Sequence, residues 1–415
     1  MSGKEQRPLV PRLRFPEFRA KDGWGCEFGN MIFDQISNKN HNSDLPVLAI
    51  TQEQGAIPRD MIDYHVSVTD KSLEGYKVVE VGNFIISLRS FQGGIEFSKY
   101  RGICSPAYVI LRLRSDHSED YFRHYLKTGR FIAQMTKNLE GLRDGKMISY
   151  KQFSELELPI PPRGEQQKIA DCLSSLDDLI AAETQKLETL NTYKKGLMQH
   201  LFPREGETVP RLRFPEFREA GEWDESTLSD IATISSGTTP LRANPEFYEG
   251  GTIPWVKTTD LNNSFIDSTE ECITPQAKAT INPVGSVLVA MYGGFKQIGR
   301  TGYLRIPAAT NQALSVLRVK SDKMLPIYLL TWLNAKVDDW KRIASSSRKD
   351  PNITGSDVAS FPIRFPLPLE QERIADCLSS FDDLITAHSQ KLDTLKAHKK
   401  GLMQQLFPTL DEVGA

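Results

Sequence analysis

The stretch Glu165–Pro203 reads EQQKIADCLSSLDDLIAAETQKLETLNTYKKGLMQHLFP, and it returns almost unchanged at Glu370–Pro408. The two copies align without gaps, and 28 of their 39 positions are identical. A second string, PRLRFPEFR, also occurs twice, at Pro11–Arg19 and Pro210–Arg218. Self-similarity over such a long period is the signature of a repeated structural unit. The 415-residue chain is therefore a tandem repeat of two halves.

Each copy of the longer repeat predicts one long helix. Proline flanks the first copy at Pro162 and Pro203 but is absent between Glu165 and Leu201, as helix limits require. Apolar residues recur at alternating steps of four and three, which is a heptad pattern. The predicted seam residues are Ile169, Leu173, Leu176, Ile180, Leu187, Leu190, Leu197 and Leu201 in the first copy and Ile374, Leu378, Phe381, Ile385, Leu392, Leu395, Leu402 and Leu406 in the second.

The simplest partner for each long helix is the other copy, in an antiparallel coiled coil that acts as a spacer. Polar residues interrupt the two seams at equivalent places, Glu183 with His388 and Lys194 with Lys399, where they can fix the register. The same stripe is also what a helix needs to pack on a globular core. That alternative is compatible with a spacer, because packing keeps the spacer rigid.

Two variable segments, Gly25–Leu158 and Asp224–Ile363, stand between the repeated strings. They share little identity but the same outline of short apolar runs, which predict strands. The paired runs are LPVLAIT from Leu45 with IPWVKTT from Ile253, GNFIISL from Gly82 with GSVLVAM from Gly285, and SPAYVILRL from Ser105 with NQALSVLRV from Asn311. Variable modules between near-identical connectors indicate two recognition units on one scaffold.

The predicted fold class is α+β, with two globular recognition domains separated by two long helices in a pseudo-twofold tandem repeat. The predicted segments are a conserved N-terminal segment at 1–24, the first module at 25–158, the central helix region at 159–205, the second module with its preceding repeat at 206–363, and the C-terminal helix region at 364–415.

The average charge of the chain hides two basic stretches. The net charge of −2 indicates no particular partner. Within each module, however, an acidic first half precedes a basic second half: Lys77–Lys151 has 13 Lys and Arg against 7 Asp and Glu, and Lys278–Lys349 has 12 against 3. Cationic surfaces bind DNA by neutralising phosphates. A charged stretch is usually only a solvated face, but its repetition in two unlike modules favours DNA binding.

Two pairs of segments within the basic stretches carry the candidate DNA contacts. The first pair holds double glycines, Gly93–Gly94 and Gly293–Gly294, which suit a turn that presents a loop. The second pair precedes the Pro-rich end of each module. Their side chains are of types that bind base edges or phosphates, although an exposed hairpin charge explains any single one equally well. The candidates are Arg89, Ser90, Gln92, Lys99, Arg101, Arg143, Lys146, Tyr292, Lys296, Gln297, Arg300, Arg348 and Lys349.

Motifs of several enzyme classes are missing from the sequence. There is no GxxxxGK[ST] loop, no GxGxxG after a strand, no Asn/Asp-Pro-Pro-aromatic tetrapeptide and no HExxH spacing. We therefore expect a protein that binds rather than catalyses, without a metal site. The five cysteines form no CxxC pair, which predicts reduced thiols and a cytoplasmic location, and Cys172 and Cys377 are expected to be packing residues.

The two predicted helices start with related strings, LPIPPRGEQQKIADCL from Leu158 and FPLPLEQERIADCL from Phe365. They also end with related strings, KKGLMQHLF from Lys194 and KKGLMQQLF from Lys399. With SGTTPLRANPEFYEGGTIPWVKTTDL from Ser236, they make nearly the whole chain resemble the specificity subunit of Type I restriction-modification enzymes. The order variable–conserved–variable–conserved carries the likeness. One departure is FPLPLEQ, which lacks the double proline of the first helix start.

The resemblance implies a DNA-binding subunit that is not catalytic by itself. Each recognition domain would bind one half of a bipartite site, and the helices would set the spacer and dock two methyltransferase subunits. Those partners would hold S-adenosylmethionine for adenine-N6 methylation, and restriction subunits using ATP and Mg could join them. No cofactor is expected on this chain.

Two other function classes remain open on the residues alone. An autonomous DNA-modifying or DNA-cleaving enzyme would act without partners, and the missing motifs argue against it. A coiled-coil scaffold without nucleic acid would show no salt-dependent DNA affinity, and it leaves both basic stretches unexplained.

Overall fold

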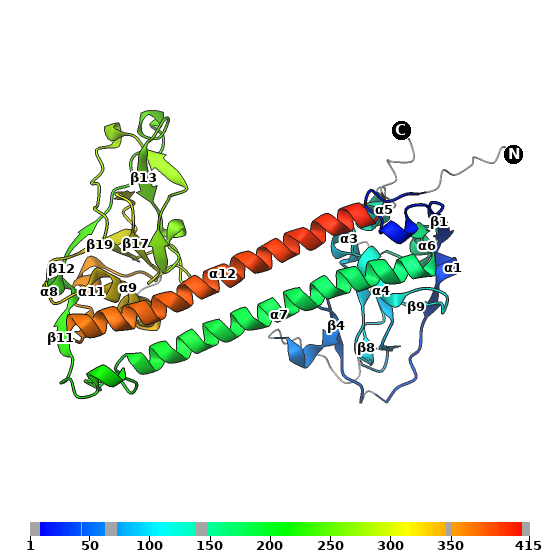
Figure 1. Ribbon diagram of the computed structural model, residues 1–415, viewed down its shortest axis with the longest axis horizontal. Helices are drawn as coiled ribbons and strands as arrows, with labels where there is room; N and C mark the ends of the chain where they lie inside the picture. Colours follow the sequence, from blue (N-terminus) through cyan, green and yellow to red (C-terminus); the bar gives the residue numbers. More distant parts are fainter. Residues whose placement is uncertain (1–8, 43, 63–72, 138–147, 346–350, 409–415) are drawn as a thin grey trace. The chain divides into compact units, whose positions relative to one another are not determined.

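The two long helices dominate the computed structural model, which describes residues 9–42, 44–62, 73–137, 148–345 and 351–408 (Figure 1). The chain divides into two compact units. Unit 1 comprises Met1–Thr184 with Lys391–Ala415, and unit 2 comprises Gln185–Gln390. Each long helix therefore contributes one part to each unit.

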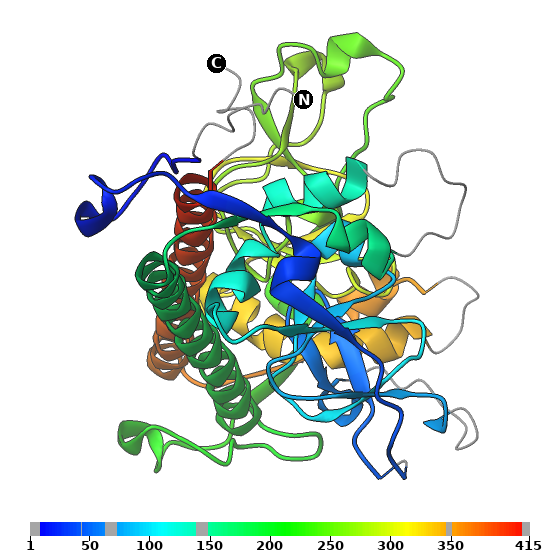
Figure 2. The same cartoon turned by 90° about the vertical axis from the view of Figure 1, so that its right-hand side faces the viewer.

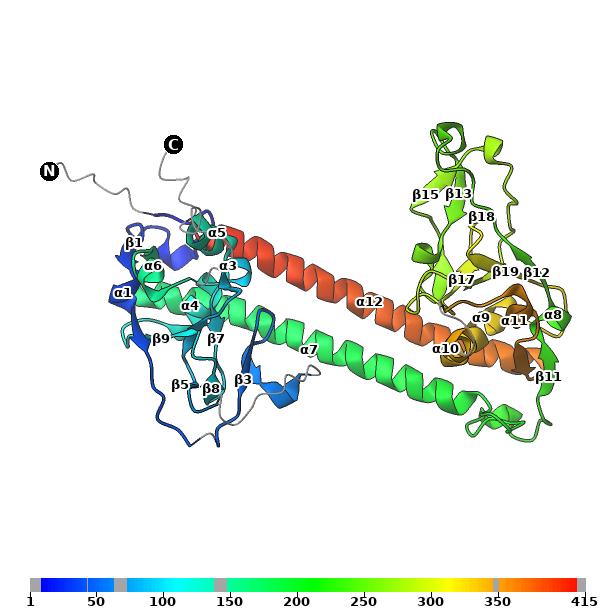
Figure 3. The same ribbon diagram turned by 180° about the vertical axis from the view of Figure 1, so that it is seen from behind.

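Helices α7 (Arg163–Leu201) and α12 (Pro368–Leu406) contain 39 residues each and occupy equivalent positions in the two repeats. The prediction of two long helices is confirmed. In unit 1, Asp177 in the first half of α7 binds Lys399 near the end of α12. In unit 2, the equivalent Asp382 in the first half of α12 binds Lys194 near the end of α7. The helix segments within each unit thus pair with opposite directions (Figure 3).

The blue and cyan strands in Figure 2 belong to unit 1, whose central sheet has the strand order β2-β9-β6-β7 with antiparallel neighbours. Three two-stranded pairs, β1–β10, β3–β4 and β5–β8, surround it. The strands are β1 (Gly25–Phe28), β2 (Phe33–Ile36), β3 (Leu48–Thr51), β4 (Gly55–Pro58), β5 (Lys77–Val79), β6 (Phe84–Ile86), β7 (Glu96–Phe97), β8 (Gly102–Cys104), β9 (Val109–Leu113) and β10 (Glu157–Ile160). The short helices are α1 (Gly29–Ile32), α3 (Ser90–Gly93), α4 (Glu119–Tyr125), α5 (Gly129–Lys137) and α6 (Tyr150–Ser154).

Unit 2 repeats this plan around a five-stranded sheet of order β12-β19-β16-β17-β14. The pair β11–β20 corresponds to β1–β10, and a small sheet β15-β13-β18 stands apart. The strands are β11 (Asp224–Thr227), β12 (Ala232–Ser236), β13 (Ile253–Val256), β14 (Ser264–Ile266), β15 (Glu271–Ile273), β16 (Val287–Ala290), β17 (Thr301–Leu304), β18 (Ala309–Thr310), β19 (Leu314–Val319) and β20 (Pro362–Phe365). The helices are α8 (Leu228–Ile231), α9 (Pro326–Ala335), α10 (Val337–Ser345) and α11 (Gly355–Ala359).

The three predicted strand correspondences are confirmed, because β3 matches β13, β6 matches β16 and β9 matches β19. Gly82 and Gly285, which stand before β6 and β16, share a φ of +89°. Only glycine adopts this left-handed conformation without strain. Two sequences with almost no identity therefore make the same turn into the same strand.

The long helices belong to the hydrophobic cores of both units. In unit 1, Ile169 and Leu173 of α7 lie in one cluster with Leu406 of α12 and the aromatic residues of α4. In unit 2, Ile374 and Leu378 lie in one cluster with Leu201. The predicted seam residues are all buried or half-buried. The stripe thus serves both helix pairing and domain packing, the two roles that its sequence left open.

Candidate nucleic-acid interface

The first candidate loop follows β6 and contains the single helical turn α3. Ser90 is 1% exposed, and its Oγ accepts a hydrogen bond from the Ser87 N–H at 2.8 Å. Gly94 ends the turn with a φ of +82°, and a Cβ there would lie 2.2 Å from the carbonyl oxygen of Leu126. These two residues hold the loop, so that Arg89 and Gln92 point outward and are exposed. Ser90, expected as a DNA contact, instead supports the loop from beneath.

The other candidates of unit 1 are less closely gathered. Lys99 and Arg101 are exposed and follow β7. Arg101 lies 3.1 Å from Glu80 in an ion pair that is more than half exposed on both sides, and such pairs contribute little. A cleft of about 650 Å³ lined by Gln52, Arg89 and Tyr108 adjoins the loop. Arg143 and Lys146 lie outside the described residues, as do Arg348 and Lys349 of the second module.

The second candidate loop follows β16 at the equivalent place. Here the paired-glycine turn has the predicted form, since Gly293 and Gly294 have φ values of +121° and +91°. The first loop differs, because its Gly93 belongs to α3. Tyr292 is 39% exposed, and its hydroxyl donates to the Gln312 carbonyl oxygen at 3.1 Å. Lys296 is exposed, while Gln297 and Arg300 are half-buried.

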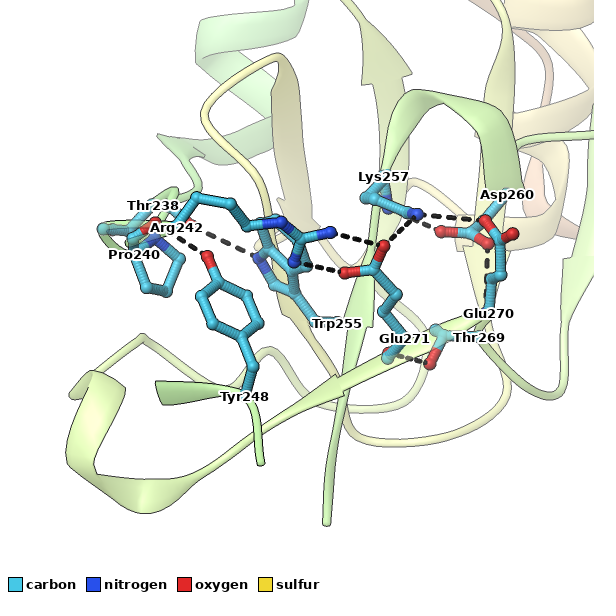
Figure 4. Close-up of polar contacts among 10 residues, drawn as sticks. All are labelled: Thr238, Pro240, Arg242, Tyr248, Trp255, Lys257, Asp260, Thr269, Glu270 and Glu271. Atoms are coloured by element: carbon cyan, nitrogen blue, oxygen red, sulfur yellow. Dashed lines mark hydrogen bonds and ion pairs between the residues drawn. The ribbon is translucent and has the colours of Figure 1, made fainter. Parts of the chain in front are cut away.

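An ion-pair cluster that the sequence did not reveal stabilises the outer part of the second module (Figure 4). Arg242 donates to both carboxylate oxygens of Glu271, at 2.6 and 2.8 Å, and its guanidinium lies 4.5 Å from the ring of Tyr248. Lys257 donates to Glu271 at 2.9 Å and to Glu270 at 3.0 Å. These hydrogen bonds lower the pKa of Glu271 to about 2.

The cluster fixes the loop between β12 and β13 rather than offering a free charge, because Glu271 neutralises its cationic partners. Trp255 Nε1 donates to the Thr238 carbonyl oxygen and the Tyr248 hydroxyl donates to that of Pro240, as Figure 4 shows. The partners Arg242 and Glu271 stand 29 positions apart. No periodic pattern links residues at that separation, so the sequence carried no signal for the pair.

The repeated strings meet at a buried ion pair in each unit. Arg14 of the first PRLRFPEFR string binds Glu165 of α7 at 2.7 and 2.8 Å, with the side chains 5% and 1% exposed. Arg213 and Glu370 repeat the pair in unit 2 at 2.8 and 2.7 Å. The shared strings are therefore the two sides of one contact that attaches each module to its helix.

The glutamine after each buried glutamate completes this attachment. Gln166 Oε1 accepts from the Ser118 N–H at 3.0 Å, and its Nε2 donates to the Pro161 carbonyl oxygen at 2.9 Å. Gln371 makes the matching bonds to the Leu325 N–H and the Pro366 carbonyl oxygen, at 2.9 and 2.8 Å. The Glu-Gln pair thus connects the helix start to the rest of each module.

A histidine lies buried where the first module meets the long helices. The ring of His124 contacts Ser174 Oγ at 3.2 Å and lies 3.8 Å from Asp177. Burial and the positive charges of Lys399 and Arg123 lower the pKa of His124 to about 3. The corresponding position in unit 2 holds Thr331, whose hydroxyl donates within its own helix.

Because His124 is buried in its neutral form, we expect unit 1 to lose stability in acid. The unfolded chain protonates His124 near pH 6.5, whereas the folded state keeps it neutral down to about pH 3. The contribution of His124 to the free energy of unfolding is therefore fully present above pH 6.5. It is lost as the pH falls toward 3, by at most about 1.4 kcal/mol per pH unit. His124→Thr copies unit 2 and should remove this loss. Hydrogen exchange of each unit between pH 8 and 5 measures it, and an identical pH dependence in both proteins would contradict the expectation.

The remaining reactive groups show no built site. Burial raises the pKa of the Cys104 thiol to about 12, and Cys172 and Cys377 lie half-buried at equivalent helix positions. Among the residues that the structure describes, no group of three His, Cys, Asp or Glu side chains could hold a metal ion. Within the same ranges, no helix combines the length and apolar character needed to cross a bilayer.

Comparison with known families connects this geometry to a function class. The model of the Type I restriction modification DNA specificity domain matches twice, at residues 26–192 and 220–397. The chain belongs to this family. Each match begins near one of the equivalent strands β1 and β11 and ends within a long helix. The two copies of the domain are thus the two halves that the sequence repeat defines.

Relatives of this specificity-domain family include subunits from bacteria and archaea. The Type I restriction enzyme EcoR124I/EcoR124II specificity subunit of Escherichia coli is 26% identical over 259 residues, 60% of this chain and 61% of the relative. The MjaVIII specificity subunit of Methanocaldococcus jannaschii is 26% identical over 366 residues, 82% of this chain and 81% of the relative. The chain thus spans about three fifths of the first relative's length.

Solved structures show the same fold. The crystal structure of a Type I restriction-modification S subunit from M. genitalium matches with a TM-score of 0.61, covering 97% of this chain and 100% of that one at 15% identity. A structure from a study of complex assembly and conformational transition of the type I R-M system matches with a TM-score of 0.57 at 17% identity, covering 93% of this chain and 98% of that one. The predicted two-domain architecture of this family is therefore confirmed.

Proposed function

We propose that this chain is the sequence-specific DNA-binding subunit of a Type I restriction-modification complex and is not catalytic by itself. Each recognition module binds one half of a bipartite DNA site. The observation that carries the proposal is the membership in the specificity-domain family, together with two structurally equivalent modules whose sequences differ. Exposed Arg89 and Lys296 lie on loops after equivalent strands, and this equivalence supports them as candidate base contacts.

The long helices act as an antiparallel coiled coil that sets the distance between the half-sites, with pseudo-twofold symmetry between the repeats. The equivalent ion pairs Asp177–Lys399 and Asp382–Lys194 support this role, because each joins the first half of one helix to the last turns of the other. Lys194 and Lys399 interrupt the heptad seam, and charged partners for them define one register. The five sequence segments at 1–24, 25–158, 159–205, 206–363 and 364–415 then act as connector, reader, helix, reader and helix.

The helices also dock two methyltransferase subunits. Leu179 and Leu384, at equivalent positions of α7 and α12, are 54% and 48% exposed and offer apolar area that a partner could cover at the same point of both helices. S-adenosylmethionine would bind to those partners, and ATP and Mg to any restriction subunits. The complex would direct adenine methylation or restriction in the cytoplasm.

Exchange of one module tests the division of labour between the readers. Replacing residues 25–158 with the corresponding segment of another family member should change one half of the methylated sequence and leave the other half intact. The measurement is a genome-wide map of methylated adenines in cells that also express the methyltransferase subunit. A change in both halves together would contradict independent readers.

The purified chain without partners should methylate and cleave no DNA.

Single arginine replacements test the proposed reading loops. Arg89→Ala and Arg300→Ala should each weaken specific binding by about 1–3 kcal/mol, the discrimination of one bidentate base contact. Each variant should relax the preference in one half-site only. Binding to duplexes mutated in either half-site measures this, with Lys186→Ala as the control because Lys186 is exposed on α7 outside both recognition modules. A uniform loss on all sequences would make these residues phosphate contacts instead.

A further inference from the structure

A basic cleft of about 780 Å³ opens in unit 1 where α5 meets the two long helices. Its floor is apolar and includes Met403 and Phe407. One acidic side chain, Asp177, lines it. The cations that line it are Arg12, Lys127, Arg130, Lys396, Lys399 and Lys400. Six positive charges against one negative charge make the cleft a site for an anion.

The cations are not equally engaged within the protein. Lys399 binds Asp177, and Lys127 binds Glu96 at 2.5 Å. Lys396 and Lys400 are exposed on successive turns of α12. Arg130 is different, because its Nε and Nη1 atoms are buried and have no hydrogen-bond partner in the part of the chain that the structure describes. Arg130 as a residue is half-buried and lines the cleft, so its positive charge favours an oxyanion there.

Helix α5 adds a second attraction for an anion. It begins at Gly129, which lines the cleft beside Arg130. The first N–H groups of a helix lack acceptors within the helix and carry partial positive charge. The Phe131 N–H is already bound by Thr128 Oγ1, so Gly129 and Arg130 present the backbone donors nearest the cleft.

Unit 2 contains an equivalent cleft of about 530 Å³. It lies where α10, the counterpart of α5, begins at Val337. Lys194, Lys195 and Phe202 occupy the places that Lys399, Lys400 and Phe407 hold in unit 1. The additional cations are Arg204 and Lys336, against one acidic residue, Asp338.

The duplication limits what the ligand can be. The paired lysines of the clefts belong to the repeated string KKGLMQ and are identical, whereas the proposed readers differ between the modules. A ligand shared by both clefts must therefore look the same at both half-sites. The phosphate of the DNA backbone meets this condition, because it is the same at every base sequence.

We propose that the two clefts are phosphate-binding sites that hold the DNA backbone next to each half-site. The inference rests on the proposed DNA-binding function and adds sequence-independent contacts to it. Arg130 and Lys400 in unit 1, and Lys195 with the exposed Arg204 in unit 2, provide the charge. A free phosphate compound has the same chemistry, and the experiment separates the two sources.

The test uses the full-length chain with its methyltransferase partner and three variants, Lys396→Gln/Lys400→Gln, Arg130→Gln, and Lys186→Gln. Lys186 is exposed on α7 outside both clefts and is the matched control. The exposed double variant carries little risk to folding, so it keeps the test valid if Arg130→Gln is unstable. Affinity is measured for a duplex with the mapped site and for a scrambled duplex, over a series of salt concentrations.

The cleft variants should bind both duplexes more weakly by the same factor. The slope of log affinity against log salt should become shallower by about 0.9 for each phosphate that the variant no longer neutralises, while Lys186→Gln should behave as wild type. A weakening confined to one sequence would overturn the proposal, since it would make the cleft a base reader. If the cleft variants kept wild-type DNA binding but lost the binding of inorganic pyrophosphate or ATP that the wild-type protein shows, the clefts would be sites for a free phosphate compound, and the assignment to DNA would be overturned.

Two further outcomes would overturn the inference. In one, DNA and pyrophosphate binding stay at wild-type values while the methyltransferase no longer co-purifies, which would assign the cleft to an acidic protein segment. In the other, no variant changes any binding. Failure of the proposed function itself is distinguishable, because wild-type protein would then show no preference between the two duplexes.

Discussion

Replacing Glu165 with alanine is expected to destabilise unit 1 by about 3–5 kcal/mol, the effect found when one partner of a buried ion pair is removed. The variant leaves the guanidinium of Arg14 buried at the helix start without its carboxylate. Arg14 retains hydrogen bonds to the carbonyl oxygens of Lys21 and Asp22, at 2.8 and 2.9 Å. Neutral carbonyl groups do not compensate a buried positive charge fully.

Hydrogen exchange followed by mass spectrometry resolves the two units and measures this effect. Protection in unit 1 should fall by about two to four orders of magnitude, while unit 2 keeps its protection. Glu370→Ala should give the reverse pattern through Arg213. The control is Glu207→Ala, whose partner Arg211 is 51% exposed and whose effect should be below about 1 kcal/mol. Equal effects of Glu165→Ala and Glu207→Ala would show that the buried pair is not what attaches the module.

The features that repeat in the sequence were also the features that could be predicted. The long helices follow from the heptad pattern between prolines, and three strand pairs follow from apolar runs. These signals are local or periodic. The turn at Gly94 was only partly predicted, because the doubled glycine indicates left-handed backbone but not that Gly93 ends a helical turn.

The contacts that fix the modules could not be predicted, because they join residues far apart in the chain. Arg14 and Glu165 stand 151 positions apart, and both strings are visible as repeats without showing that they touch. The sequence suggests Ser90 as a DNA contact only because it stands between Arg89 and Gln92. Its burial depends on how the loop packs, which no local pattern reveals. The unit 1 cleft combines α5 with α7 and α12, and the unit 2 cleft combines α7 with the start of α10, so only the folded chain brings their charges together.

A chain ending at Pro203 is expected to form a dimer in which the second copy replaces the missing helix α12. Truncation removes Leu406 and Phe407, which are 1% and 3% exposed and pack in the core of unit 1 beside Tyr121 and Tyr125. Removing two such side chains from the core costs about 3–6 kcal/mol. Covering the exposed apolar surface of the remaining half-chain again is therefore energetically favourable.

The repeat supplies a replacement of the right shape. The end of α7 carries Leu201 and Phe202 where α12 carries Leu406 and Phe407, and Lys194 where it carries Lys399. In the dimer, Lys194 of one copy should bind Asp177 of the other, as Lys399 does in the full chain. Two identical readers related by this exchange should recognise an inverted repeat of the first half-site, because the dimer has twofold symmetry.

Light scattering of the truncated chain should give twice the monomer mass, and adenine mapping with the methyltransferase should give the inverted repeat. Leu201→Ala/Phe202→Ala should prevent dimerisation, whereas Lys186→Ala, on an exposed part of the same helix, should not. A truncated chain that stays monomeric would show that the helix ends are not interchangeable.

In the full chain, lengthening both helices in phase after Glu183 and after its equivalent His388 should change only the spacing between half-sites, because each added residue extends a helix by about 1.5 Å and leaves both readers intact.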